Sequence, residues 1–215
     1  MNFYKASLSL IRTVIHDETL VRILTPLGQA IEICHQRTEG LTEGNDTAYI
    51  DLIIDNETEA VENLLGTAFI SCQTFITNIV SEIILIHKNH NKLNPKNKLK
   101  TTGDTRLEIL SFGEKLNNNS KYTSVQIIDA VANYYKHRDE WSFNWGNLSG
   151  KSAKTAEIIM SVGASTGCTG NLRMASRVLG NPNYIDTFEF YKIIYRWCIN
   201  LHDDYKKEIE QLKLI

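Results

Sequence analysis

The stretch ETEAVENLLGTAFISCQTFITNIVSEIILIHK, residues 57–88, decides the fold class. Apolar side chains recur along it every three or four residues, which places them on one face of an α-helix. They are Val61, Leu64, Leu65, Ala68, Cys72, Ile76, Ile79, Val80, Ile83 and Ile86. About thirty residues at 1.5 Å each give a helix roughly 45 Å long, and Asn56 with Glu59 matches an N-cap and its reciprocal partner. The sequence therefore predicts that the longest helix includes residues 64–84.

The segments on the N-terminal side of this stretch also favour helices. Only three prolines occur in 215 residues, which leaves room for long helices. Apolar residues recur at helical spacing through residues 3–36, and Pro26 is expected to kink this run or to begin a second helix. Residues 48–55, AYIDLIID, predict either a short strand or part of a helix, because periodicity alone does not separate the two.

The C-terminal side completes a helical pattern. Residues 105–116 predict a small strand or a helical turn, and a helix is expected to begin near Ser124. The tail, residues 155–215, predicts a helix, a glycine-rich turn, a short helix and a long terminal helix. We therefore predict an all-α fold in which residues 1–215 form a single helical domain, a bundle of about five to seven helices with at most a minor β-hairpin.

Composition narrows the classes of function. The net charge of −2 provides neither a basic field for nucleic acid nor the acidic excess of a disordered chain. The four cysteines are widely spaced without a CxxC pair, so the sequence predicts reduced thiols rather than a zinc site or a disulfide framework. No stretch reaches ~18 apolar residues and the N-terminus lacks the pattern of a secretion signal. We expect a cytoplasmic protein without a membrane span, a metal or a cofactor.

Three stretches could bind phosphate groups, and each has a plainer interpretation. Residues 88–100, KNHNKLNPKNKLK, are typical of a solvated loop, because they lack the arginine or aromatic residues of a nucleic-acid contact. Residues 146–152, GNLSGKS, are one residue short of a nucleotide-binding loop and follow no buried strand. Residues 162–171, VGASTGCTGN, favour a helix-to-helix connection, although a backbone anion site with Asn171 and Arg173 stays open.

The segment most typical of a functional site is ANYYKHRDEW, residues 132–141. Residues four apart lie about 40° apart around a helix, so Asn133 and His137 share a face, with Arg138 one step round. An amide and an imidazole together can hold a phosphate or ribose oxygen, and the histidine can exchange a proton near neutral pH. We take these three residues as candidate catalytic residues. Binding contacts are expected from Tyr134, Lys136, Asp139, Glu140 and Trp141.

The same segment has a structural alternative. Asn133 and His137 could satisfy buried backbone groups of a helical core, with Arg138 and its acidic neighbours in surface ion pairs. If His137 is functional instead, it should be partly accessible to solvent, within reach of Asn133 and beside a cation.

ANYYKH resembles the R-N-x-x-x-H motif of HEPN domains, small helical bundles frequent in bacterial toxins and antiphage systems. The resemblance implies a bundle that dimerises, pairs two motifs and cleaves RNA without a metal. Asn133 matches the polar position and His137 the histidine, whereas Ala132 replaces the arginine. An arginine would stabilise charge on the scissile phosphate, so either Arg138 supplies that charge or RNA cleavage has been lost.

Two functions follow as hypotheses. The first is an HEPN-like, metal-independent RNA-acting effector of the bacterial or phage conflict type, a homodimer that uses Asn133, His137 and Arg138. The alternative is a catalytically silent helical module that binds a protein partner or a nucleotide, and a purely structural protein is the third possibility. RWCINLH offers a second candidate motif, Arg196 with His202, but six residues of unbroken helix place these side chains about 240° apart.

Overall fold

The protein is a bundle of long helices with a cap of shorter ones. The computed structural model describes residues 3–39, 41, 47–117, 120–141 and 144–214. Within these ranges, seven α-helices have eight or more residues: α1 (Phe3–Ile15), α2 (Thr19–Glu39), α3 (Thr47–Leu93), α5 (Ser124–His137), α6 (Gly150–Met160), α7 (Asn171–Val178) and α8 (Phe188–Gln211). Shorter helical segments are α4 (Arg106–Leu110), η1 (Arg138–Glu140) and η2 (Trp145–Asn147). The all-α prediction is confirmed.

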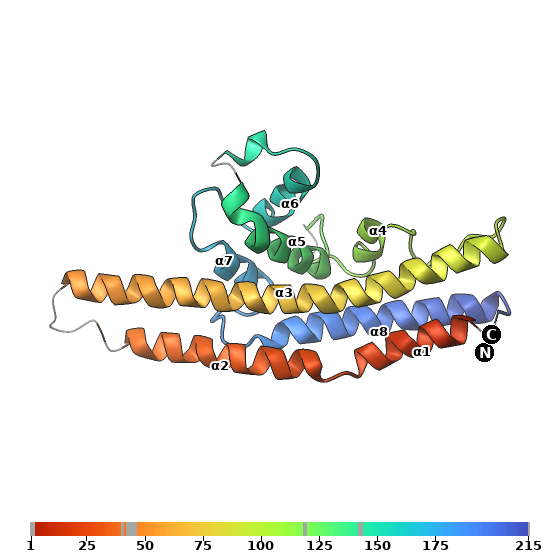
Figure 1. Cartoon of the computed structure of the whole chain (residues 1–215), viewed down its shortest axis with the longest axis horizontal. Helices are drawn as coiled ribbons and strands as arrows, with labels where there is room; N and C mark the ends of the chain where they lie inside the picture. Colours follow the sequence, from red (N-terminus) through yellow and green to blue (C-terminus); the bar gives the residue numbers. More distant parts are fainter. Residues whose placement is uncertain (1–2, 40, 42–46, 118–119, 142–143, 215) are drawn as a thin grey trace.

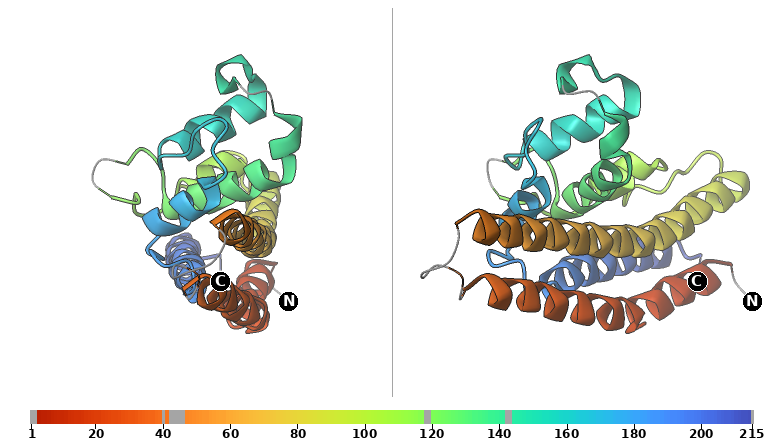
Figure 2. Two further views of the ribbon diagram at one scale, coloured as in Figure 1. Left: turned by 90° about the vertical axis from the view of Figure 1, so that its left-hand side faces the viewer. Right: turned by 60° about the vertical axis from the view of Figure 1, so that its left-hand side comes forward.

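The helices lie in three layers (Figures 1 and 2). Helices α1 and α2 follow one another along one side, α3 and α8 form the middle, and α4 to α7 cover the opposite side of α3. The two chain termini lie at the same end of the bundle, near the end of α3. Among the described residues, β-pairing is limited to one isolated antiparallel bridge between Lys115 and Thr123, which agrees with the expectation that any sheet is minor.

Helix α3 organises the core. It runs for 47 residues, and its apolar stripe is buried between the outer layers, with Leu65, Ile76 and Ile83 fully enclosed. The prediction that the longest helix includes residues 64–84 is confirmed. In the part of the chain that is described, α3 is also the one helix long and apolar enough to cross a membrane, a test that core helices of soluble proteins pass as well.

Two predicted boundaries within residues 1–60 are wrong. Helix α3 begins at Thr47 rather than after Asn56, so residues 48–55 are helical and Asn56 lies inside the helix. The N-terminal run breaks at residues 16–18 and not at Pro26, because the Asp17 carboxylate accepts the backbone N–H of Thr19 at 2.9 Å and caps α2. Pro26 lies inside α2, where the helix continues past the one hydrogen bond that proline cannot donate.

The lysine-rich connection is held against α8. The prediction of a solvated loop at residues 88–100 is wrong for residues 88–93, because helix α3 extends to Leu93. The residues that follow return along the bundle (Figure 1). The Glu208 carboxylate accepts the backbone N–H groups of Lys100 (2.6 Å) and Thr101 (2.9 Å), and Leu99 is buried. The backbone of this segment therefore serves to close the end of the bundle.

Candidate functional site

Helix α5 carries most of the segment 132–141 and its orientation decides what each residue contacts. The helix begins at a capping box, in which Thr123 and Gln126 each accept the other's backbone N–H. Its apolar face packs against α3, and Ala132 is fully buried there. The residue in the place of the HEPN arginine therefore points into the core, where a guanidinium would be desolvated and would lie away from any substrate.

Tyr135 sets how closely α5 approaches α3. Its ring lies directly over Gly66, where an added Cβ would overlap the ring atoms. Arg138 stacks over the same ring, with its guanidinium carbon 4.7 Å from the ring centroid. Arg138 also donates to the Asn63 side-chain oxygen at 3.3 Å. Arg138 is thus anchored to α3 by stacking and a hydrogen bond.

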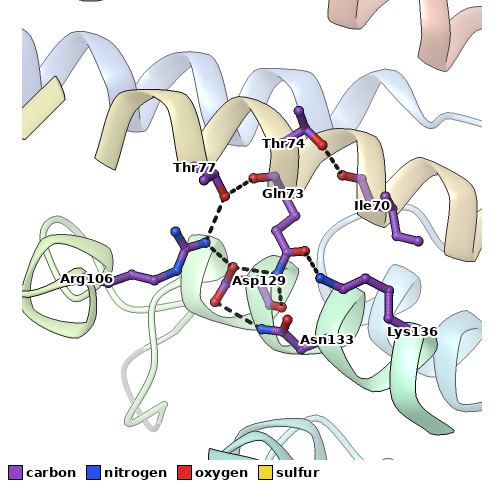
Figure 3. Close-up of polar contacts among 8 residues, drawn as sticks. All are labelled: Ile70, Gln73, Thr74, Thr77, Arg106, Asp129, Asn133 and Lys136. Atoms are coloured by element: carbon purple, nitrogen blue, oxygen red, sulfur yellow. Dashed lines mark hydrogen bonds and ion pairs between the residues drawn. The ribbon is translucent and has the colours of Figure 1, made fainter. Parts of the chain in front are cut away.

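Asn133 belongs to a polar network between α3, α4 and α5, which Figure 3 shows. Asp129 stands at its centre and accepts hydrogen bonds from Gln73 (2.8 Å), Arg106 (2.6 Å) and, more weakly, Asn133 (3.5 Å). Lys136 donates to the Gln73 side-chain oxygen at 2.7 Å. Because the charged groups and amides bond to one another, this network joins three helices.

His137 lies outside that network. Its side chain is 51% exposed, and its Nδ1 is 3.2 Å from the carboxylate of Glu140, the residue three positions later. Asn133 bonds to Asp129, Arg138 to Asn63 and His137 to Glu140, so the three candidate catalytic residues have separate partners. The accessibility expected of a functional His137 is present, whereas its bonded partner is a carboxylate rather than Asn133 or a cation.

Other residues of the segment line a cleft at the C-terminal end of α5. Tyr134, Arg138 and Asp139 face two adjoining hollows of about 580 and 360 Å³. The larger hollow is lined by residues 55–62 of α3, and the smaller one by Trp141 and Trp145. Cys168 and Thr169 of the glycine-rich connection border both hollows. The binding residues Tyr134, Asp139 and Trp141 are therefore brought together, whereas no lining contact involves Lys136 or Glu140 among the described residues.

Three aromatic rings form one wall of the cleft. Tyr134, Trp141 and Trp145 pack edge to face, with centroids separated by 5.3, 5.6 and 5.5 Å. Tyr134 and Trp145 are buried and Trp141 is partly exposed. Trp145 was missed by sequence reasoning, although its position four residues after Trp141 was a usable signal.

Carboxylates of α3 form the opposite wall. Asp55 and Glu59 are exposed, lie one turn apart and have no ion pair within the described ranges. With Asp139 they place three carboxylates beside one guanidinium, that of Arg138. The sequence held no signal for this role, because two acids four residues apart on a long helix usually mark a solvated face.

Glu62 also lines the cleft and bonds to the residues that follow the glycine-rich connection. Its buried carboxylate accepts the backbone N–H groups of Leu172 (3.2 Å) and Arg173 (3.3 Å) and the Arg173 side chain (2.9 Å). Burial raises the pKa of Glu62, and the hydrogen bonds from Arg173 and Leu172 partly counter that rise. The anion site that the sequence left open at Asn171 and Arg173 is thus filled by the protein's own carboxylate.

The remaining candidates are dispersed. Residues 146–152 join η2 to α6, and no strand precedes them in the described chain, so a nucleotide-binding loop has no basis there. Arg196 borders a different cavity, and His202 pairs with Asp203 at 2.9 Å, so the second motif does not form one site. The four cysteines are free. Within the described residues, no group of three or more His, Cys, Asp and Glu side chains could hold a metal ion.

Comparison with models of known protein families, with curated proteins and with solved structures finds no match to this chain. The resemblance to HEPN domains therefore rests on Asn133 and His137 alone and stays a prediction.

Proposed function

We propose that the protein is a binding module that holds a basic segment of a partner protein in the cleft between α3, α5 and the glycine-rich connection. The observation that carries the proposal is an aromatic wall opposite two carboxylates, those of Asp55 and Glu59, that have no ion pair among the described residues. Aromatic faces attract ammonium and guanidinium groups, and carboxylates complete their recognition. This corresponds to the catalytically silent module predicted from sequence, with a protein as the partner.

The charge of the cleft favours a cation over a phosphate. Asp55, Glu59 and Asp139 face it, and Arg138 is the one cation of its lining among the described residues. The Nε atom of Arg138 lies 3.9 Å from the Asp139 carboxylate, and Arg173 is already paired with Glu62, so Asp55 and Glu59 are the acids without a cation. A phosphodiester would meet three carboxylates, which is unfavourable. A lysine or arginine side chain would meet the same carboxylates favourably.

The size of the cleft fits a short peptide segment. Its two hollows of about 580 and 360 Å³ adjoin at Tyr134, Arg138 and Asp139. Each lies in the range of about 300–1,000 Å³ that is usual for ligand sites. One hollow is mainly acidic and the other mainly aromatic, so a basic side chain with a neighbouring apolar one would fill both.

A titration with a short lysine-rich peptide tests the proposal. Trp141 and Trp145 are two of the three tryptophans, so intrinsic fluorescence reports on the cleft. The double variant Asp55→Asn and Glu59→Gln removes two charges and should weaken binding roughly three- to tenfold. Affinity should also fall as salt is raised.

The matched control is Glu32→Gln, which removes an exposed acid on α2 remote from the cleft lining. A second control is the same peptide with each lysine replaced by glutamine, which should not bind. The proposal is wrong if the basic peptide fails to bind, or if Glu32→Gln weakens binding as much as the double variant.

RNA hydrolysis at His137 is the second candidate function, and the exposure of the imidazole beside Glu140 is the observation that favours it. The imidazole could transfer a proton while Glu140 orients its ring. The HEPN resemblance adds the expectation of a homodimer. Cleavage of RNA with and without a chelator, compared between wild type and His137→Ala, tests this function, and light scattering at micromolar concentration tests the dimer. No cleavage by the wild type would remove this candidate.

A further inference from the structure

Asn171, the first residue of α7, lies where the parts of the cleft meet. The next two residues, Leu172 and Arg173, donate their backbone N–H groups to Glu62, which holds this end of α7 against α3. The side chain of Asn171 is 4% exposed and lines neither hollow. Any influence of Asn171 on a ligand therefore passes through the residues that its amide contacts.

The Asn171 amide bonds to both backbone polar groups of Ser165. Its Oδ1 accepts the N–H of Ser165 at 2.9 Å, and its Nδ2 donates to the Ser165 carbonyl oxygen, also at 2.9 Å. The orientation of the amide is fixed, because turning it over would set donor against donor and acceptor against acceptor. Asn171 therefore holds the backbone of the glycine-rich connection at one point and in one orientation.

The glycine-rich connection depends on this contact. Residues 165–169 are all exposed, so burial of their side chains does not fix the segment. Within the segment, the N–H of Cys168 reaches the Ser165 carbonyl oxygen at a longer distance, 3.4 Å. Residues 166–169 line the smaller hollow and directly follow the residue that Asn171 holds. The position of Ser165 thus sets where this side of the hollow lies.

The same amide also reaches the aromatic wall. Asn171 Nδ2 donates its second hydrogen bond to the hydroxyl of Tyr134 at 3.0 Å. The Tyr134 ring in turn packs edge to face on Trp141 and Trp145. Both N–H groups and the oxygen of this buried amide are thus bonded, and together they tie the glycine-rich connection to the aromatic wall.

We propose that Asn171 is a positioning residue of the cleft, which sets the separation of the glycine-rich connection from the aromatic wall and so the width of the smaller hollow. The inference rests on the proposed function and deepens it, because this hollow is the one that would take the apolar side chain beside the basic one. A hollow whose walls are fixed before binding loses less conformational freedom when the ligand binds. Replacement of Asn171 should therefore weaken binding although it removes no contact with the partner.

Acrylamide quenching of tryptophan fluorescence tests the position of the walls without a ligand. In Asn171→Ala the two walls lose their link, so Trp141 and Trp145 should become more accessible and the quenching constant should rise. The third tryptophan, Trp197, is buried outside the cleft and contributes equally in every variant. Circular dichroism verifies that each variant is folded.

Asn181→Ala is the matched control, because it also removes a buried asparagine. Asn181 is 1% exposed, accepts the N–H of Asp186 at 3.1 Å and lies beyond the other end of α7, where it lines neither hollow. A purely structural effect of losing a buried amide would appear in both variants. Only Asn171→Ala should change the quenching.

A fluorescence titration with a lysine-rich peptide that carries an apolar residue beside a lysine measures the effect on binding. Asn171→Ala should weaken binding about fivefold, and Asn181→Ala should stay within about twofold of the wild type. Tyr134→Phe removes only the hydroxyl that accepts from Asn171, so it should raise the quenching in the same direction but less.

The inference is overturned if Asn171→Ala leaves the quenching unchanged, if it binds the peptide as the wild type does, or if Asn181→Ala produces the same changes. If Asn171→Ala does not fold, the quenching of Tyr134→Phe decides, and a wild-type value overturns the inference. A wild type that does not bind the peptide would refute the proposed function instead. The quenching comparison would then still decide whether Asn171 positions the two walls.

Discussion

Two clusters of polar side chains flank α5, and they differ in how many of their charged groups have a hydrogen-bond or ion-pair partner. In the network at Asp129, the carboxylate faces Gln73, Arg106 and Asn133. In the cleft, Glu62 is bonded as completely, but the neighbouring acids on α3 have no ion pair among the described residues. Polar groups bonded to one another hold a scaffold together, whereas open charges beside aromatic rings remain available to a ligand.

This difference divides the segment 132–141. Asn133 and Lys136 belong to the scaffold, Tyr134 and Asp139 to the cleft, and His137 to neither. Residues adjacent in sequence thus have separate roles, because successive residues of a helix point about 100° apart.

The largest effect is expected from Glu62→Ala, which removes the cleft carboxylate that accepts three hydrogen bonds. It leaves the first N–H groups of α7 and the Arg173 guanidinium without their acceptor, so the free energy of unfolding should fall by about 2–4 kcal/mol. Urea denaturation followed by circular dichroism measures the loss. Glu59→Ala, three residues earlier and without an ion pair in the described chain, should change the stability by no more than about 0.5 kcal/mol. Equal losses for the two variants would contradict the division of the cleft into bonded and open acids.

Asp129→Ala should have the next largest effect, on stability alone. Gln73 and Arg106 lose their shared acceptor, which should cost about 1–3 kcal/mol. Affinity for the basic peptide should stay that of the wild type, since Asp129 does not line the cleft. A loss of peptide binding in a folded Asp129→Ala protein would show that the two clusters are coupled.

His137→Ala should leave stability within about 0.5 kcal/mol of the wild type, because the side chain is half exposed and makes one contact to an exposed carboxylate. Thermal denaturation of the two proteins at the same pH makes the comparison. A loss of several degrees in Tm would show that the imidazole stabilises the fold, a role that its exposure argues against.

The smallest expected effect is on the pH dependence of stability. Burial raises the pKa of Glu62, so the folded protein holds this proton more tightly than the unfolded chain does. Its contribution to the free energy of unfolding is therefore greatest below about pH 4.3, the ordinary pKa of a glutamate, and declines as pH rises through the raised value. The stability of wild type relative to Glu62→Gln should decline between pH 4 and pH 8.

Glu157 provides the opposite case as a control. Hydrogen bonds from Lys121, Tyr122 and Lys154 lower the pKa of Glu157 to about 2. Its contribution is present above the ordinary pKa of a glutamate and is lost as pH falls toward 2, so Glu157→Gln should show no such trend between pH 5 and pH 8. The same decline in both variants would mean that Glu62 is not its source.

The helical fold could be predicted because it follows from local patterns. The apolar residues of 57–88 recur at helical spacing and form a wide stripe, and no other secondary structure buries that spacing. The boundaries were less predictable. The chain breaks at residues 16–18, where Asp17 accepts the N–H of Thr19, and α2 continues through Pro26. Residues 48–55 carry a pattern that suits a strand or a helix.

The sequence by itself determined which residues of α5 share a face, and it marked residues 132–141 as unusual. Only the tertiary structure decided what each face meets. Gly66 admits the Tyr135 ring and so sets the approach of α5 to α3, which buries Ala132 and aligns Tyr134 with Glu59 across the cleft. Gly66 and Tyr135 are 69 positions apart and Glu59 and Tyr134 are 75 apart. Helical periodicity is a local property and carries no information about such pairs.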